Sequence, residues 1–233
     1  IQLLINAEAN INAQGGYYGI ALQVTLSKGN IKVVKLLLEQ GANLDMANND
    51  GWTPLNNASY NGHIEVVKLL LAKGSDVMAL NSTGRSAFLH AISSGNFELF
   101  TMFLDCTPSL VTSKDHFGST ALSIASRYGH KDMVRVLLPL SNTDLTLADD
   151  FGRTPFWWAQ RQNHIHIVEQ IIEFADKTGL PILEQLQAAA GPAQFSLDRR
   201  LCDICWTIVR EKSTLVLGSA LVVILIFACI VKV

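Results

Sequence analysis

Two cysteines near the end of the chain, Cys202 and Cys205, are separated by two residues. This spacing allows two thiolates to bind the same metal ion, most often zinc. A tetrahedral zinc site needs two further ligands, but no second C-x-x-C and no histidine pair follows. Cys229 lies inside an apolar run. Cys202 and Cys205 are therefore candidate metal ligands that form only half a site, and we predict neither a bound metal nor a cofactor.

Three histidines, His63, His130 and His164, recur at one position of a repeated pattern. Their separation by whole repeats rules out a compact triad with a local nucleophile, so we expect a structural role. His164 and His166 lie two apart on an expected helix and face different directions. No pair of carboxylates stands out, and no G-x-x-x-x-G-K-[ST] phosphate loop is present. The sequence therefore predicts no catalytic residue, no small-molecule substrate and no enzymatic activity.

The charge balance excludes one class of partner. With 18 basic and 20 acidic residues the net charge is −2, which gives no electrostatic basis for binding nucleic acid. Four scattered cysteines are too few for a disulfide scaffold and favour a reducing compartment. The chain begins at Ile1, and Ile1, Leu3 and Leu4 would leave an apolar edge on a stacked array. We therefore expect the chain to be a fragment, with further repeats or another domain before Ile1.

The elements that position these residues repeat along the chain. "GNIKVVKLLLEQGANLDMANNDG", which begins at Gly29, aligns with "GHIEVVKLLLAKGSDVMALNSTG", which begins at Gly62. The same frame begins again at Gly95 and at Gly129, so four copies keep an almost constant period. Self-similarity at this period indicates a repeat architecture.

Each unit reads as two short helices. In "DGWTPL", Thr53 is expected to cap the first helix and Pro54 to occupy its first position. An apolar stripe predicts the second helix and consists of Ile64, Val67, Leu70 and Leu71. A single helix pair cannot bury its apolar stripe, so the units must stack.

The segment "DGWTPLNNASYNGHIEVVKLLLAKGSDV" resembles the ankyrin repeat. The resemblance covers residues 1–178 and implies an all-α solenoid of helix-turn-helix units. It gives a partial first repeat over 1–16 and units over about 17–49, 50–82, 83–116, 117–150 and 151–178. The variant "AQGGYYGIALQVTLSKGNIKVVKLLLEQGAN" is similar to repeats of fungal ankyrin arrays, some of which follow a NACHT-type NTPase domain.

Several positions depart from the ankyrin pattern. The histidine that usually follows Thr-Pro-Leu is replaced by Asn56, Leu89, Ser123 and Trp157. Pro139 stands where Ala72 stands two units earlier, so we expect the second helix of that unit to end about one turn early.

The resemblance implies that the turn tips and the exposed sides of the first helices form a concave binding face. Exposed aromatic and arginine side chains are typical anchors of protein interfaces. We therefore expect an unidentified protein partner to bind a set of tip and first-helix residues, which are Asn49, Trp52, Ser59, Tyr60, Arg85, Ser93, His116, Phe117, Arg127, Phe151, Arg153 and Arg161. Trp157 is expected to close the end of the stack.

The C-terminal residues read as a linker and a membrane helix. Residues 179–212 form a linker that contains a short helix and the C-x-x-C pair, and residues 213–233 form the predicted helix. Leu215 to Val231 are 17 uncharged residues, long enough to span about 25 Å. Arg210 and Lys212 precede them, which favours a single-pass protein with its array in the cytosol. The residues expected to contact lipid are Leu215, Leu217, Leu221, Val222, Ile224, Leu225, Phe227 and Ile230.

Arg200 to Cys205 resemble the opening of a ZZ-type zinc finger, which follows some fungal ankyrin arrays. The rest of such a finger is absent, so a second interpretation treats the apolar tail as a reading-frame artefact. The sequence thus predicts a non-enzymatic interaction scaffold that is anchored to a membrane and otherwise cytoplasmic. The alternative is a soluble ankyrin sensor fragment of a larger NACHT-type signalling NTPase, with a truncated zinc finger.

Overall fold

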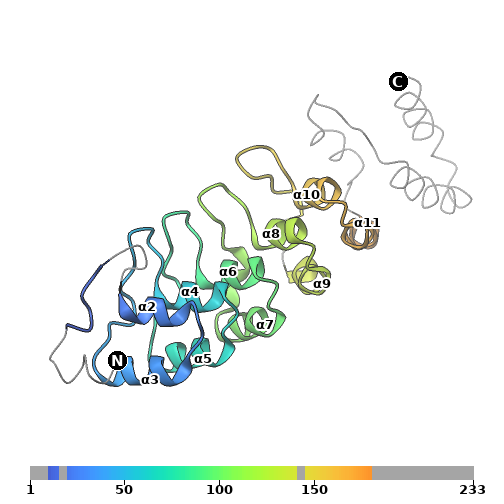
Figure 1. Ribbon diagram of the computed structural model, residues 1–233. Helices are drawn as coiled ribbons and strands as arrows, with labels where there is room; N and C mark the ends of the chain where they lie inside the picture. Colours follow the sequence, from blue (N-terminus) through green and yellow to red (C-terminus); the bar gives the residue numbers. More distant parts are fainter. Residues whose placement is uncertain (1–9, 16–19, 141–144, 180–233) are drawn as a thin grey trace, which may run out of the picture. The chain divides into compact units, whose positions relative to one another are not determined.

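The computed structural model describes residues 10–15, 20–140 and 145–179. Helices in this part of the chain alternate between a first and a second helix of each pair (Figure 1). The first helices are α2 (Ala21–Leu26), α4 (Pro54–Tyr60), α6 (Ala87–Ser93), α8 (Ala121–Tyr128) and α10 (Pro155–Arg161). The second helices are α3 (Ile31–Glu39), α5 (Ile64–Ala72), α7 (Phe97–Cys106), α9 (Lys131–Leu140) and α11 (Ile165–Thr178). A short 3-10 helix, η1 (Pro108–Thr112), follows α7.

Each first helix packs on its own second helix, and neighbouring first helices pack on each other. Contacts join α2 to α4, α4 to α6, α6 to α8 and α8 to α10. The second helices form a parallel row, in which α3 contacts α5, α7 contacts α9 and α9 contacts α11. Figure 1 shows the loops between pairs projecting together from the row of first helices. The stack therefore presents one face made of first helices and turns.

The stack buries helices that are too short to be stable alone. The first helices have six to eight residues, and isolated helices of that length are marginal in water. One buried position recurs in every first helix and is filled by Leu22, Leu55, Phe88, Leu122 and Phe156. A second recurs in every second helix and is filled by Val34, Val67, Phe100, Val134 and Val168. These side chains make one continuous core.

Capping residues set where the first helices begin. The Thr53 hydroxyl accepts a hydrogen bond from the Asn56 amide at 3.2 Å, and Pro54 occupies the first helical position. The prediction for both residues is confirmed. Thr120 and Thr154 cap α8 and α10 in the same way, and Ser86 does so for α6. Each cap satisfies one of the amides that the first turn of a helix leaves unpaired.

The second helix of the fourth pair differs from its prediction. We expected Pro139 to end this helix early, but α9 continues through Pro139 to Leu140. Pro139 lies in the last turn, where its missing N–H removes a single hydrogen bond. Met133, Val134 and Leu137 are buried and hold the helix against the core. The length of the helix is therefore decided by packing.

The interval from Gly95 to Gly129 is one residue longer than the intervals before it, and the second helix inside it, α7, is one residue longer than α3 and α5. Helices α3 and α5 have nine residues each, whereas α7 and α9 have ten. The extra residue leaves the turns and first helices in equivalent places. The unit boundaries given above stay a prediction.

The predicted transmembrane helix needs a correction. Within the described residues, no helix combines the length and the apolar character that crossing a bilayer requires. The longest described helix, α11, has 14 residues and spans about 21 Å, shorter than the roughly 30 Å hydrocarbon core. It also carries charged residues, which include Glu169, Glu173 and Lys177.

For the described residues the fold class is therefore corrected to an all-α repeat solenoid in which no helix could span a membrane, and a single-pass membrane location is not supported. The predicted segment 213–233 lies outside the described residues. The residues predicted to contact lipid also lie outside the described residues, namely Leu215, Leu217, Leu221, Val222, Ile224, Leu225, Phe227 and Ile230.

Candidate interaction face

One polar residue organises each turn at the edge of the face. Asn48, Asn81, Asp115 and Asp149 occupy equivalent positions in four successive units. The Asp115 Oδ1 atom accepts hydrogen bonds from the Phe117 and Ser119 amides at 3.1 and 2.9 Å. The other three oxygens accept from amides two and four residues ahead in the same way. Such side-chain bonds mimic a backbone turn and fix the shape of each tip.

Neighbouring turns are joined by backbone hydrogen bonds. The Ser82 amide donates to the Asp50 carbonyl at 3.1 Å, and the His116 amide donates to the Thr83 carbonyl at 2.9 Å. The Asp150 amide donates to the Phe117 carbonyl at 2.9 Å. A Cβ atom at Gly84, whose φ is +75°, would collide with His116. This close approach explains why a glycine stands in the turn.

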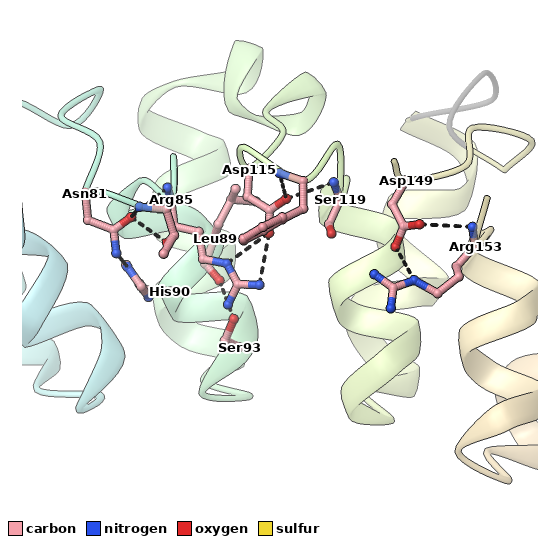
Figure 2. Close-up of polar contacts among 11 residues, drawn as sticks. Asn81, Arg85, Leu89, His90, Ser93, Asp115, Ser119, Asp149 and Arg153 are labelled. Atoms are coloured by element: carbon pink, nitrogen blue, oxygen red, sulfur yellow. Dashed lines mark hydrogen bonds and ion pairs between the residues drawn. The ribbon is translucent and has the colours of Figure 1, made fainter. Parts of the chain in front are cut away.

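Two arginines donate hydrogen bonds to the carboxylates that organise the turns (Figure 2). Arg85 donates from Nε and Nη2 to the Asp115 Oδ2 atom of the next turn, at 3.1 and 3.0 Å. Arg153 donates from Nε to Asp149 Oδ2 within its own turn, at 2.8 Å. The carboxylate side chains of Asp115 and Asp149 are fully buried. Each carboxylate thus shapes its turn with one oxygen and binds an arginine with the other.

A strip of aromatic and arginine side chains crosses the C-terminal part of the face. It comprises Phe117, Phe151, Arg153, Trp158, Arg127 and Tyr128, and we call it the aromatic–arginine strip. The Arg127 and Arg153 guanidiniums lie 4.3 and 4.4 Å from the centre of the Trp158 ring. At one end Arg153 lies 4.3 Å from the Phe151 ring, and the Phe117 and Phe151 ring centres are 6.5 Å apart. At the other end Arg127 lies 5.7 Å from the Tyr128 ring.

The outer rings of the strip remain accessible. Phe151 is 65% exposed, Phe117 46% and Tyr128 44%, whereas Trp158 is buried beneath the two arginines. Cation–π contacts of this length orient the guanidiniums against the indole. The strip therefore offers flat, preorganised apolar surface beside fixed positive charge.

A second cluster lies between α4 and α6. Trp52 stacks on His90 with ring centres 4.1 Å apart, and the Tyr60 ring meets both edge-on. The His90 Nε2 atom lies 3.2 Å from Asn81 Nδ2, so His90 is assigned as the acceptor. Burial, with a smaller contribution from the Arg85 charge, lowers the pKa of His90 to about 3. The imidazole is therefore neutral at physiological pH and serves as an aromatic ring.

The predicted surface residues fall into three groups by exposure. Six are exposed, namely Asn49, Tyr60, His116, Phe117, Phe151 and Arg161. Five are half-buried, namely Trp52, Arg85, Ser93, Arg127 and Arg153. Ser59 is completely buried and is removed from the predicted surface, because its position on α4 faces the neighbouring helices. Ser93 uses its hydroxyl to donate to the Leu89 carbonyl at 2.9 Å.

The structure brings together residues that the sequence could not group. Phe117, Arg127, Phe151 and Arg153 join in the strip, whereas Trp52 and Tyr60 belong to the other cluster. His90 and Trp158, at the centres of the two clusters, were missed. Both are the fourth residue of a first helix, in α6 and in α10. Two ring-bearing side chains at one repeat position were a signal that could have found them.

The metal prediction concerns residues beyond those that the structure describes. Cys202 and Cys205 lie outside them, as does the resemblance to a zinc finger. In the described ranges, no cluster of three or more His, Cys, Asp or Glu side chains could hold a metal ion.

Comparison with known families agrees with the repeat geometry. A family model described as ankyrin repeats (3 copies) matches residues 1–81 and 88–179, and one described as ankyrin repeats (many copies) matches residues 62–104. The Notch-regulated ankyrin repeat-containing protein of Xenopus tropicalis is 40% identical over 60 residues, which cover 26% of this chain and 53% of that protein. The human protein of the same name is 38% identical over the same shares. The chain spans about half the length of the curated relatives that it matches.

Proposed function

Because the chain belongs to the ankyrin repeat family, we propose that its array binds a partner protein through the aromatic–arginine strip. Ankyrin repeats point to a protein–protein interaction scaffold, and proteins of this family are generally not enzymes. Family membership supports protein binding in general, and we add to it the choice of face and of anchoring residues.

One observation carries the proposal most directly. Phe117 and Phe151 expose large rings on adjacent tips, and Arg153 rests against one of them. The part of these rings that stays in contact with water adds no hydrophobic stabilisation to the array. Aromatic side chains next to arginine are enriched where interfaces gain most of their free energy. The backbone bonds between tips keep the two rings in register, which reduces the entropy lost on binding.

A selection experiment tests this face without knowledge of the natural partner. A random peptide library displayed on phage would be selected against the 233-residue chain, and the affinities of the recovered peptides would be measured. We expect Phe151→Ser to weaken most of them at least tenfold, because the variant removes a central anchor.

The matched control is Phe97→Ser, which removes an exposed phenylalanine from α7 in the other row of helices. The peptides should bind this variant with unchanged affinity. If Phe97→Ser abolishes binding and Phe151→Ser leaves it intact, the partner surface lies on the second helices and the proposal is wrong.

A further inference from the structure

The row of first helices has an unusual charge composition. The five helices α2, α4, α6, α8 and α10 contain no aspartate and no glutamate. Their only permanently charged side chains are Arg127 on α8 and Arg161 on α10. These two residues occupy the same repeat position on successive first helices. His90, on α6, is buried and neutral.

The second helices show the opposite composition. They carry charges of both signs, many of which are paired, as in Lys68 with Glu65 and Glu98, and Arg135 with Asp132. Among the described residues, neither Arg127 nor Arg161 takes part in an ion pair. The positive charge on the face is therefore not compensated by its own helices.

Arg127 is held in place although no acidic side chain of the described residues pairs with it. Its guanidinium lies over Trp158 and beside Tyr128. Stacking on rings uses the flat faces of a guanidinium and leaves its N–H edges available. Those edges match a carboxylate, which can accept two parallel hydrogen bonds. Arg161 is exposed at the equivalent place of the neighbouring helix.

The separation of Arg127 and Arg161 matches the spacing of alternate side chains on an extended peptide. Packed helices lie about 8–10 Å apart, so equivalent side chains on α8 and α10 begin at about that separation. Residues two to four apart on an extended chain lie roughly 7–13 Å apart. Two acidic side chains at such a spacing could each reach one arginine.

The other charges near the strip leave a positive balance. Asp115 and Asp149 are buried and bound to Arg85 and Arg153. Asp150 is exposed at a tip, and Lys114 is exposed near the neighbouring tip. These two opposite charges offset each other, so Arg127 and Arg161 determine the sign of the surface.

We infer that the partner segment is an extended acidic peptide whose carboxylates bind Arg127 and Arg161 while an apolar side chain packs on the strip. This inference rests on the proposed function and specifies its ligand. Nucleic acid also carries negative charge, but a protein with 20 acidic and 18 basic residues lacks the broad positive field that such binding requires.

Synthetic peptides test the inference with the 233-residue chain. The probe is a fluorescein-labelled 12-residue peptide with four glutamates around one phenylalanine, measured by fluorescence anisotropy. Its counterparts replace the glutamates by glutamine or by lysine. We expect the glutamate peptide to bind at least tenfold more tightly than either counterpart at low salt, and to lose that advantage in 0.5 M NaCl.

Variants of the arginines locate the effect. Arg161→Gln and Arg127→Gln should each weaken the glutamate peptide about threefold to tenfold, and Arg161→Lys should retain more affinity than Arg161→Gln. Arg135→Gln is the matched control, because Arg135 is exposed on α9 and pairs only with Asp132 among the described residues. Circular dichroism of each variant checks that the array is folded.

Three outcomes would overturn the inference. They are equal binding of the glutamate and glutamine peptides, no detectable binding of the glutamate peptide at 1 mM, and unchanged binding to Arg127→Gln and Arg161→Gln. Tighter binding of a 12-nucleotide single-stranded DNA, lost in the same variants, would reassign the arginines to phosphate. The proposed function fails separately: neutral library peptides that depend on Phe151 would support the interaction face and refute only the acidic ligand.

Discussion

At the scale of single residues, one repeat position shows how burial and hydrogen bonding compete. Gln23 on α2 is buried, and its Nε2 atom donates to the Met46 and Trp52 carbonyls at 3.0 and 2.6 Å. Asn56 occupies the equivalent place on α4, but neither its Oδ1 nor its Nδ2 atom has a hydrogen-bond partner. The asparagine side chain is one methylene shorter than that of glutamine. A buried amide without partners is expected to be destabilising.

Replacing Asn56 should therefore stabilise the array. Asn56→Gln would place the amide within reach of the Ala79 and Arg85 carbonyls, as Gln23 does one unit earlier, and Asn56→Leu would remove the unpaired atoms. We expect each variant to raise the free energy of unfolding by about 1 kcal/mol in urea titrations. Gln23→Asn is the reverse control and should lower it. A loss of stability in both Asn56 variants would contradict this explanation.

A second prediction at this scale concerns pH. Because the pKa of His90 is about 3 in the folded array and about 6.5 in the unfolded chain, the unfolded chain binds a proton first as the pH falls. The contribution of the neutral His90 side chain to the free energy of unfolding is complete above pH 6.5 and is lost as the pH falls towards 3. Burial also lowers the pKa of His130, which acts in the same direction.

Unfolding measured between pH 6 and pH 5 should show the effect before most carboxylates titrate. His90 alone should reduce the free energy of unfolding by about 1 kcal/mol over that unit. His90→Phe keeps a ring beside Trp52 and should reduce this slope, whereas Phe97→Ser, which changes no titratable group, should leave it unchanged. Equal slopes in wild type and His90→Phe would show that His90 is accessible to protons in the folded array.

At the scale of elements, the turns depend on a pair that spans two units. Arg85 binds the buried Asp115 carboxylate, and Asp115 also organises the turn before α8. Arg85→Met would leave that carboxylate buried without its partner, and we expect a loss of about 2 kcal/mol in unfolding free energy. Asp115→Asn keeps the oxygen that the turn needs, as Asn81 does one unit earlier. Asp115→Asn should therefore lower the unfolding free energy by less than Arg85→Met does.

The double variant separates pairing from packing. If the carboxylate causes the loss, Arg85→Met combined with Asp115→Asn should be more stable than the sum of the single changes implies, by roughly 1 kcal/mol or more. Arg135→Met removes an exposed pair of the same type and should change stability by less than about 0.5 kcal/mol. If the changes in unfolding free energy of the two single variants simply add, the two turns are held by their backbone hydrogen bonds alone.

At the scale of the whole molecule, the repeat period was enough to predict the solenoid. Local rules sufficed there: Thr53 caps a helix, Pro54 begins it, and Val67 and Leu70 face the core. The candidate face was predicted only in part, because contacts between units decide which tip residues remain accessible. Arg85 and Ser59 were both expected on the binding surface, yet one binds a carboxylate in the next turn and the other is buried.

Other predictions failed or stay untested for different physical reasons. Helix α9 passes through Pro139 because packing outweighs the loss of one hydrogen bond in its last turn. The strip could not be recognised in the sequence because Arg127, Arg153 and Trp158 meet only after two units stack. The larger signalling NTPase stays a prediction, and so do the linker and the pair Cys202 and Cys205.

The bonds between adjacent tips have a mechanical consequence. Ser82 with Asp50, His116 with Thr83 and Asp150 with Phe117 join each turn only to the next one. The main helix contacts likewise connect neighbouring pairs. A pull applied along the stack is thus carried in series, as in a chain of links. Compliance then adds from one link to the next, and the weakest link sets the tension that the whole array can bear.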